Sequence, residues 1–304
     1  MPKLITILGP TACGKTRLAA QLCRHFNGEI ISCDSRQFFR GMNIGSGKDY
    51  ADLLVDDISI PIHLIDILNP SDEYDVFSYQ KDFIQAFHKI NSASKNAFLV
   101  GGSGLYLSAI LQNYRFSKAD FNSSRVDELN QLATEELVVH LKNISSQLHN
   151  STDLIERERI IKAILIAESD NTAESAKISN FVSELTALVI GLNIDRSLSK
   201  QIIAKRLSSR FKEGMIEEVQ QLLAAGISPD RLKFFGLEYK FITSYLLSEI
   251  SLADMKEKLL FAIYNFAKRQ MTWFRRMEKQ GVKINWIDAP YYENARPLIE
   301  NFIG

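Results

Sequence analysis

The chain has 304 residues, of which 46% are hydrophobic and 24% are charged, and its formal net charge is zero. This composition indicates a soluble globular protein with one large domain, or a domain that carries an insertion. No run approaches eighteen uninterrupted apolar residues, so we expect no membrane span. The charge is uneven, because residues 230–283 carry eleven Lys or Arg and six Asp or Glu. A basic surface for a polyanionic partner is therefore expected in the C-terminal part.

The N-terminal run LITILG leads directly into a glycine-rich loop, so it predicts a buried strand rather than a signal peptide. The three cysteines, Cys13, Cys23 and Cys33, have no metal-ligand spacing, and neither do the five histidines. Such sparse cysteine usage is typical of a reducing compartment. We expect a cytoplasmic protein without a zinc site, and a monomer.

Short apolar runs alternate with helical patterns in the first third of the chain. The runs LITILG, EIISCD, IHLIDI and AFLVGG each predict a buried strand, and residues 15–26 and 76–90 have apolar side chains at helical spacing. This alternation is typical of a parallel sheet with right-handed crossovers. The predicted fold class is therefore α/β, with a parallel sheet flanked by helices, and the glycine-rich loop after its first strand makes this sheet P-loop NTPase-like.

The pattern changes near residue 118. Residues 125–144 and 155–169 are helical in pattern, and TALVIGL at 186–192 again predicts a buried strand. The remainder is mostly helical, with residues 204–226 and 259–281 as its long elements. We predict a first part of the core at 1–117, a helical insertion domain at 118–184, and completion of the core with C-terminal helices at 185–304.

The sequence GPTACGKT at residues 9–16 matches the phosphate-loop pattern G-x-x-x-x-G-K-[ST]. Gly9 and Gly14 let the backbone curl so that its N–H groups point at oxygens, and the helix that follows adds its N-terminal dipole. Lys15 supplies a point charge, and the Thr16 hydroxyl is suited to Mg²⁺. A strand before the loop and an amphipathic helix after it favour a true phosphate site over a chance glycine turn.

Asp34 and Ser35 follow the next predicted strand at its carboxyl end, where parallel sheets carry their active sites. Asp34 is a candidate Mg²⁺ ligand or general base. The alternative is that Asp34 or Ser35 only caps a following helix. The residues by themselves leave both interpretations open.

Five motifs together identify a family. GPTACGKT, ISCDSRQFFRGMNIGSGKD, IPIHLIDI, VGGSGLYL and AKRQMTWFRR occur in one order from Gly9 to Arg276, and this combination resembles the tRNA dimethylallyltransferase (tRNA isopentenyltransferase) family. The resemblance implies transfer of a dimethylallyl group from dimethylallyl diphosphate to the N6 amine of the adenosine just 3′ of the anticodon. The products are N6-(dimethylallyl)adenosine and diphosphate. The phosphate loop then holds the diphosphate of an isoprenoid rather than ATP.

The resemblance also implies site roles. Asp34 matches the catalytic base, Arg210 an arginine that stabilises the leaving diphosphate with Mg²⁺, and Ser103 a diphosphate contact where the family usually has Thr. The candidate diphosphate-binding residues are Gly9, Thr11, Ala12, Cys13, Gly14, Lys15 and Thr16, with Thr16 also the Mg²⁺ ligand. Ser35 and Gln37 resemble residues that line the adenine pocket.

RNA contacts are predicted in two regions. The basic residues beside the aromatic pair in AKRQMTWFRR suit an RNA backbone, whereas Trp273 and Phe274 themselves are expected in the core. The candidates are Lys268, Arg269, Arg275 and Arg276. The resemblance implies that the insertion grips the anticodon stem-loop, and its candidates are Arg157, Arg159 and Lys162.

Three other functions compete with this one. A P-loop nucleotide kinase is disfavoured because no arginine-rich lid is apparent. A transferase acting on free AMP or ADP is disfavoured because a free nucleotide needs neither the insertion nor the basic helix. A non-catalytic RNA-binding protein is disfavoured by the intact Lys15, Thr16 and Asp34.

Overall fold

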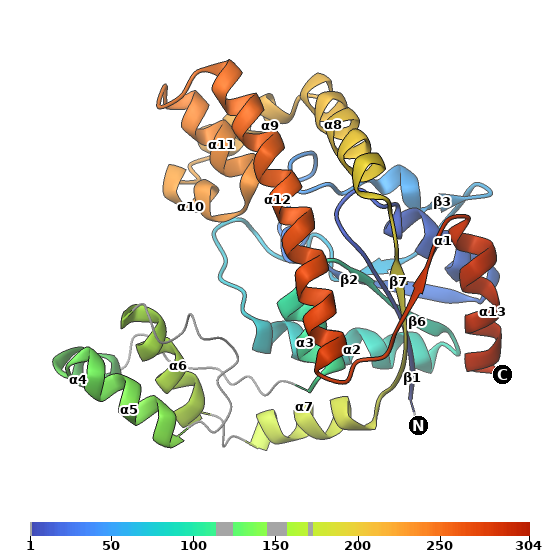
Figure 1. Cartoon of the computed structure of the whole chain (residues 1–304), viewed down its shortest axis with the longest axis horizontal. Helices are drawn as coiled ribbons and strands as arrows, with labels where there is room; N and C mark the ends of the chain where they lie inside the picture. Colours follow the sequence, from blue (N-terminus) through green and yellow to red (C-terminus); the bar gives the residue numbers. More distant parts are fainter. Residues whose placement is uncertain (1, 114–123, 145–156, 170–172) are drawn as a thin grey trace.

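A computed structural model describes residues 2–113, 124–144, 157–169 and 173–304 (Figure 1). Its centre is a six-stranded sheet with the strand order β5-β2-β6-β1-β7-β8, and every pair is parallel. The strands are β1 (Lys3–Leu8), β2 (Gly28–Cys33), β5 (Ile62–His63), β6 (Asn96–Gly101), β7 (Thr186–Leu192) and β8 (Ile284–Ile287). This confirms the predicted α/β class.

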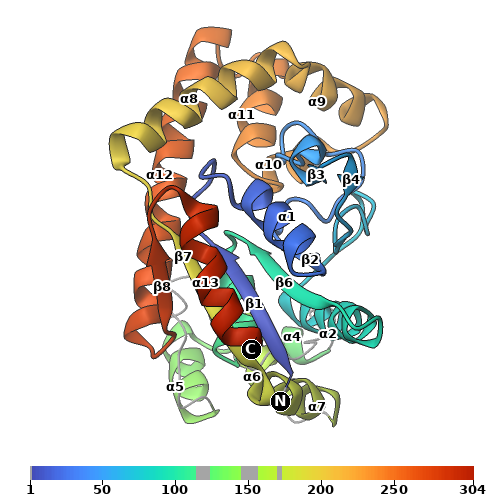
Figure 2. The ribbon, with the colours of Figure 1, turned by 90° about the vertical axis from the view of Figure 1, so that its right-hand side faces the viewer.

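Helices cover both faces of the sheet. The central strands are therefore buried along almost their whole length. On one face α1 (Lys15–His25) and α13 (Tyr291–Ile303) share a hydrophobic cluster with β1 and β7. On the other face lie α2 (Val76–Ser92) and α3 (Gly104–Leu111), which share a cluster with part of α12 (Leu252–Lys279). Figure 2 shows α1 and α13 in front of the strands.

A group of helices stands above the carboxyl ends of the strands (Figures 1 and 2). It comprises α8 (Arg196–Lys212), α9 (Met215–Ala224), α10 (Pro229–Phe234), α11 (Leu237–Leu246) and the first half of α12. At about 1.5 Å per residue the 28-residue α12 is about 42 Å long. It therefore reaches from this group of helices down to α3 on the face of the sheet.

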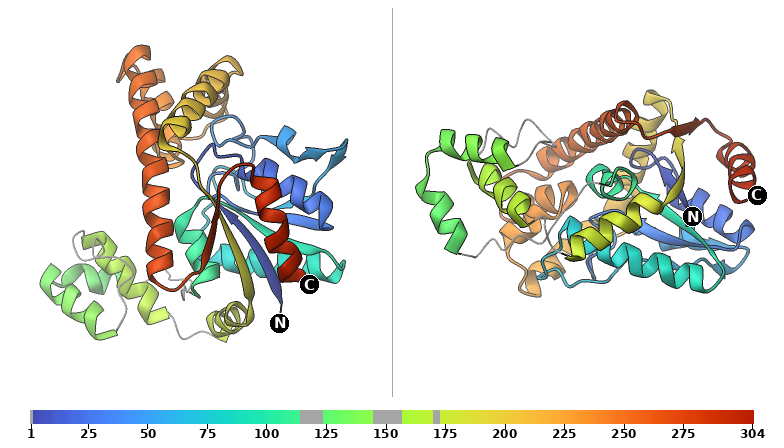
Figure 3. Two further views of the ribbon diagram at one scale, coloured as in Figure 1. Left: turned by 45° about the vertical axis from the view of Figure 1, so that its right-hand side comes forward. Right: turned by 90° about the horizontal axis from the view of Figure 1, so that it is seen from below.

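The predicted insertion contains helices that pack in two different ways. The helices α4 (Ser124–Gln131), α5 (Thr134–Ile144) and α6 (Arg157–Ser169) share a hydrophobic cluster of their own. In contrast, α7 (Ala173–Glu184) packs on α2, where Ile178 and Val182 cluster with Phe77. Figure 3 shows α4–α6 beside the sheet layers and α7 beneath them.

Several predicted elements differ from the structure. The strand predicted at 62–67 is wrong beyond His63, because Leu64 and Asp66 have positive φ angles of 58° and 53° that end the extended chain. The helix predicted at 204–226 is broken at Gly214, whose φ is 96°.

The helix predicted at 125–144 is likewise two helices, α4 and α5. A 3₁₀ turn η1 (Tyr50–Leu53), a hairpin of β3 (Leu54–Val55) and β4 (Ile58–Ser59), and the edge strand β8 were not predicted. In the described part of the chain, the helices are too short or too polar to cross a membrane.

Candidate active site

The phosphate loop connects the end of β1 to the start of α1. Positive φ angles at Ala12 (64°) and Gly14 (85°) curl the loop, and Gly14 precedes the first residue of the helix. A Cβ at Gly9 would lie 2.8 Å from the Cys13 Sγ, so a larger residue does not fit there without a shift. The loop therefore has the tight turn and the open helix N-terminus that a phosphate chain requires.

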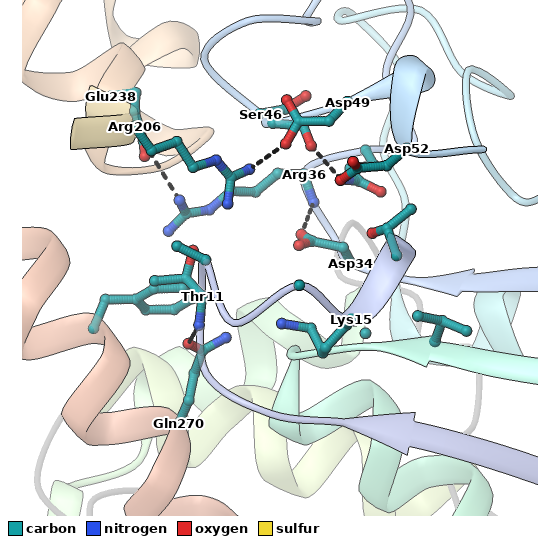
Figure 4. A pocket seen from close by; sticks show the side chains of 18 of the residues that line it. Thr11, Lys15, Asp34, Arg36, Ser46, Asp49, Asp52, Arg206, Glu238 and Gln270 are labelled. Carbon is teal, nitrogen blue, oxygen red and sulfur yellow. Dashed lines mark hydrogen bonds and ion pairs between the residues drawn. The ribbon is translucent and has the colours of Figure 1, made fainter. Parts of the chain in front are cut away.

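Lys15 is the first residue of α1 and lies at the floor of a pocket (Figure 4). Its Nζ donates to the Pro10 carbonyl at 2.7 Å and lies 3.8 Å from the Cys13 Sγ. Thr11, Ala12, Gly14 and Thr16 line the same pocket. Five of the seven predicted diphosphate-binding residues therefore meet there, whereas Gly9 and the buried Cys13 shape the loop from behind.

Asp34 enters the pocket from the end of β2. The residues after it form turns rather than a helix, so the alternative interpretation of Asp34 or Ser35 as a helix cap is wrong. The Asp34 Oδ1 accepts the Arg36 backbone N–H at 3.2 Å, which orients the carboxylate toward the space above Lys15 (Figure 4). Beside it, the Ser103 hydroxyl accepts the Ser35 N–H at 3.1 Å, so these two predicted residues are neighbours.

Gln37 is fixed by its own side chain. Its Nε2 donates to the Gly47 carbonyl at 3.0 Å, and its Oε1 accepts from the Ser32 hydroxyl at 3.3 Å. Gln37 lines the pocket together with Asp34. Both the oxygen and the nitrogen of this predicted adenine-pocket residue's side-chain amide therefore bond to protein atoms.

Two arginines from α8 approach the pocket opposite the phosphate loop. The Arg206 Nη2 lies 3.0 Å from an Asp49 carboxylate oxygen, and the Arg210 Nη2 lies 3.7 Å from the same oxygen. Burial, followed by repulsion from Arg206, lowers the pKa of the Arg210 guanidinium. The predicted Arg210 thus has an unpredicted companion, and their i, i+4 spacing on one helix is the signal that points to it.

The loop below the arginines allows this close approach because of Gly47. Its φ is 77°, and a Cβ there would lie 2.2 Å from the Arg210 Nη2. The loop itself is held from α9, since the buried Glu218 accepts the backbone N–H groups of Asn43, Ile44 and Gly45 at 2.7–3.0 Å. The Tyr239 hydroxyl donates to the same carboxylate at 2.9 Å. No local sequence pattern predicts this contact between Glu218 and the loop.

A third charged contact closes the pocket on the α11 and α12 side. The Arg36 Nη1 lies 2.9 Å from Glu238 Oε2, and its guanidinium carbon lies 4.7 Å from the centre of the Phe266 ring. All three residues line the pocket with Asp34, and Asp52 lines it near Asp49. They were missed because residues from three separate regions meet only in the folded chain.

The four predicted RNA-binding residues of α12 do not line this pocket. Lys268, Arg269 and Arg275 are exposed, and Arg276 is partly buried. Phe274 is fully buried, whereas the half-buried Trp273 donates its indole N–H to the Ser108 hydroxyl at 2.9 Å; their expected packing is confirmed.

In the insertion, the Arg157 guanidinium donates to the backbone carbonyls of Asn130 and Leu132 at the end of α4, so Arg157 holds α4 and α6 together. This internal role makes Arg157 a poor candidate for RNA contact. Lys162 is exposed, and the side chain of Arg159 lies outside the described residues.

A phosphate loop, an arginine pair and a carboxylate at the carboxyl edge of a parallel sheet together define a P-loop protein that acts on a phosphorylated substrate. The model of the IPP transferase family matches residues 37–277. A tRNA dimethylallyltransferase 1 from Syntrophus aciditrophicus is 46% identical over 300 residues, 99% of this chain and 98% of that protein. One from Porphyromonas gingivalis is 47% identical over 288 residues, 94% of each chain.

Solved structures agree with these relatives. A tRNA isopentenylpyrophosphate transferase from Bacillus halodurans is 28% identical, with a TM-score of 0.70 over 99% of this chain and 98% of that chain. A eukaryotic dimethylallyltransferase acting on tRNA, 22% identical, shares the fold with a TM-score of 0.75 over 95% of this chain and 74% of that chain. The chain belongs to the IPP transferase family and is a prenyltransferase.

Proposed function

We propose that this chain transfers a dimethylallyl group from dimethylallyl diphosphate to the N6 amine of the adenosine just 3′ of the anticodon in tRNA. The observation that supports this most directly is one pocket in which the phosphate loop, the arginine pair and Asp34 face the same space (Figure 4). The relatives named for tRNA modification favour an RNA acceptor over AMP or ADP. Their names also disfavour a nucleotide kinase.

The reaction exchanges one bond for another at a single carbon. The N6 lone pair forms a C–N bond to C1 of the dimethylallyl group while the bond from C1 to the diphosphate oxygen breaks. The N6 proton passes to the Asp34 carboxylate, since neutral adenine amines are poor nucleophiles. Negative charge gathers on the leaving diphosphate, where Lys15, Arg206 and Arg210 stabilise it.

We propose Mg²⁺ as the cofactor. The pocket contains the Thr16 hydroxyl and carboxylates of Asp34, Asp49 and Asp52, and hard oxygen donors of this kind fit Mg²⁺. No group of three His, Cys, Asp or Glu that could hold a metal occurs among the described residues, which is compatible because Mg²⁺ is commonly held by few protein ligands plus substrate phosphates. When bound, Mg²⁺ supplies charge neutralisation to the leaving diphosphate.

We assign RNA binding to two surfaces. One is the exposed basic face of α12, with Lys268, Arg269 and Arg275 as the phosphate contacts and Arg276 beside them. The other is α4–α6 within the insertion at 118–184, because this unit has its own core whereas α7 packs on α2. Residues 1–117 and 185–304 then form the catalytic core, in a cytoplasmic monomer.

A transfer assay tests the proposal. Purified protein, Mg²⁺ and radiolabelled dimethylallyl diphosphate are incubated with unmodified tRNA or with AMP. We expect label in nuclease-sensitive RNA, released on digestion as a prenylated adenosine. Label in AMP alone would assign the protein to free-nucleotide transferases, and consumption of ATP without prenyl transfer would assign it to the kinases.

A further inference from the structure

One buried side chain of α12 reaches into the phosphate loop. Gln270 is only 7% exposed. Its Oε1 accepts the Thr11 backbone N–H at 2.8 Å, and its Nε2 donates to the Gly102 carbonyl at 2.9 Å (Figure 4). The amide therefore joins three segments that are far apart in the sequence: the phosphate loop, the loop between β6 and α3, and α12.

The chemistry of these contacts requires an amide. A backbone N–H needs an acceptor and a backbone carbonyl needs a donor, and the two ends of one glutamine amide supply both. The approach is also close, since a Cβ at Gly102 would lie 2.4 Å from the Gln270 Nε2. Neither a carboxylate nor an apolar side chain of similar length makes both bonds.

One partner of Gln270 lines the candidate diphosphate site, and the other lies next to it in the chain. Thr11 lines the pocket within the phosphate loop. Gly102 directly precedes Ser103, whose hydroxyl accepts the Ser35 N–H next to Asp34. Gln270 thus joins the phosphate loop to the loop after β6, whose Ser103 contacts the turn that carries Asp34.

The turn of α12 that contains Gln270 also carries two residues of the surface that we propose binds RNA. Lys268 and Arg269 directly precede Gln270 and are exposed. One turn later, the Trp273 indole N–H donates to Ser108 of α3, and a Cβ at Gly104 would meet the Trp273 ring at 2.4 Å. The inner face of α12 is therefore in tight contact with the β6–α3 region, while Lys268 and Arg269 on its outer side are exposed and suited to a polyanion.

We propose that Gln270 is a positioning residue that couples RNA binding on α12 to diphosphate binding at the phosphate loop. This inference rests on the proposed function. RNA that fixes α12 also fixes the Gln270 amide, and the amide holds the Thr11 and Gly102 backbones in the arrangement that accepts the diphosphate. By linkage, diphosphate must then strengthen RNA binding by the same factor.

The test is a titration that needs no turnover. Inorganic diphosphate with Mg²⁺ is titrated calorimetrically into the full chain, with and without an unmodified anticodon stem-loop RNA. In the wild type we expect the RNA to tighten diphosphate binding by about fivefold or more. In Gln270→Met the RNA should change it by less than about twofold, while the RNA affinity of the free protein stays close to the wild-type value.

Two further variants separate the coupling from a general loss of structure. Gln270→Glu keeps an acceptor for the Thr11 N–H but loses the donor to Gly102, so its coupling should be intermediate. Thr272 is exposed on the same helix, and within the described part of the chain its hydroxyl bonds to the Lys268 carbonyl of that helix. Thr272→Ala should therefore couple as the wild type does.

Coupling that persists in Gln270→Met, or that is absent in the wild type, would overturn the proposal. Failure of the RNA to bind at all would instead contradict the proposed function. In that case the diphosphate titration alone decides whether Gln270 positions the loop: weaker binding in Gln270→Met supports this role, and unchanged binding refutes it.

Discussion

At the scale of single residues, the position of Asp34 depends on a bond within its own turn. The Asp34 Oδ1 accepts the Arg36 N–H, and this short-range contact keeps the carboxylate above Lys15. The Asn side chain retains an acceptor for that N–H but does not take up a proton from adenine. Asp34→Asn should therefore lower kcat about 10²–10⁴-fold while RNA affinity stays within twofold.

Single-turnover transfer and equilibrium RNA binding, measured on the same preparation, check this prediction. A parallel thermal unfolding experiment verifies that the variant is folded. If RNA binding falls as steeply as turnover, Asp34 has a structural role and another group accepts the proton.

Which site residues the sequence reveals depends on how they come together. Lys15, Thr16 and Asp34 follow buried strands within a few residues, so a local pattern predicts both their chemistry and their place. Asp49 and Glu238 have no such pattern, because each becomes part of the site only through a partner on another element. Their charges are indistinguishable in the sequence from those of solvated surface residues.

At the scale of elements, α9 supports a loop that it does not adjoin in sequence. Glu218 is buried and accepts three consecutive backbone N–H groups of the loop at 43–49, together with the Tyr239 hydroxyl. Glu218→Ala should destabilise the protein by about 2–4 kcal/mol, because these donors lose their partner away from water. It should also weaken diphosphate binding, since the same loop carries Asp49 beside the arginines.

Urea unfolding and diphosphate titration measure the two effects. Glu217→Ala is the matched control, because Glu217 precedes Glu218 on α9 but is exposed. This change should alter stability by less than about 0.5 kcal/mol. A Glu218→Ala protein with wild-type stability would show that water accepts hydrogen bonds from the backbone N–H groups of residues 43–45 as well as the carboxylate does.

The sequence was most informative about elements whose periodic pattern is long. The four central strands and α2 were predicted close to their observed limits, since a continuous apolar run or a helical face defines each of them. The strand β8 has only four residues and gains its place by pairing with β7, which no local pattern reveals. Gly214 ends a helix although apolar periodicity continues past it, because its φ of 96° breaks the helix.

The unit of α4–α6 has an acid-sensitive link between its helices. Glu168 on α6 accepts from Arg125 on α4 and pairs with His140 on α5. The Arg125 hydrogen bonds, with further help from His140, lower the pKa of Glu168 from 4.5 to about 2. A depressed carboxyl pKa stabilises the folded state above its unfolded value, so this stabilisation should decline as the pH falls from about 4.5 to about 2.

Comparison of Glu168→Gln with the wild type isolates this effect. Near neutral pH the variant should be less stable by about 1 kcal/mol, a value reduced by solvent screening of a partly exposed pair. The difference should shrink as the pH approaches 2, where the wild-type carboxyl is itself protonated. Urea unfolding at several pH values, followed by circular dichroism, gives the two curves, and a constant difference would contradict the link.

At the scale of the whole molecule, a neutral chain is proposed to bind a strongly charged RNA. This is possible because Lys268, Arg269 and Arg275 are exposed on α12, within residues 230–283, which carry eleven Lys or Arg against six Asp or Glu. Each phosphate contact releases counterions, so the logarithm of the binding constant falls with the logarithm of the salt concentration by about 0.7–0.9 per contact. The slope therefore counts contacts independently of the absolute affinity.

The double variant Lys268→Ala/Arg269→Ala should weaken tRNA binding and reduce the salt slope by about 1.4–1.8, because two phosphate contacts are lost. The control is Arg24→Ala/Lys89→Ala, which removes two exposed charges from α1 and α2. Both double variants lower the net charge by two, so a general electrostatic effect on RNA binding appears equally in each. A difference between their salt slopes therefore reports the loss of phosphate contacts. Filter binding of unmodified tRNA across a range of salt concentrations gives the slope for each double variant. Equal slopes for the two variants would show that this face of α12 does not contact the RNA.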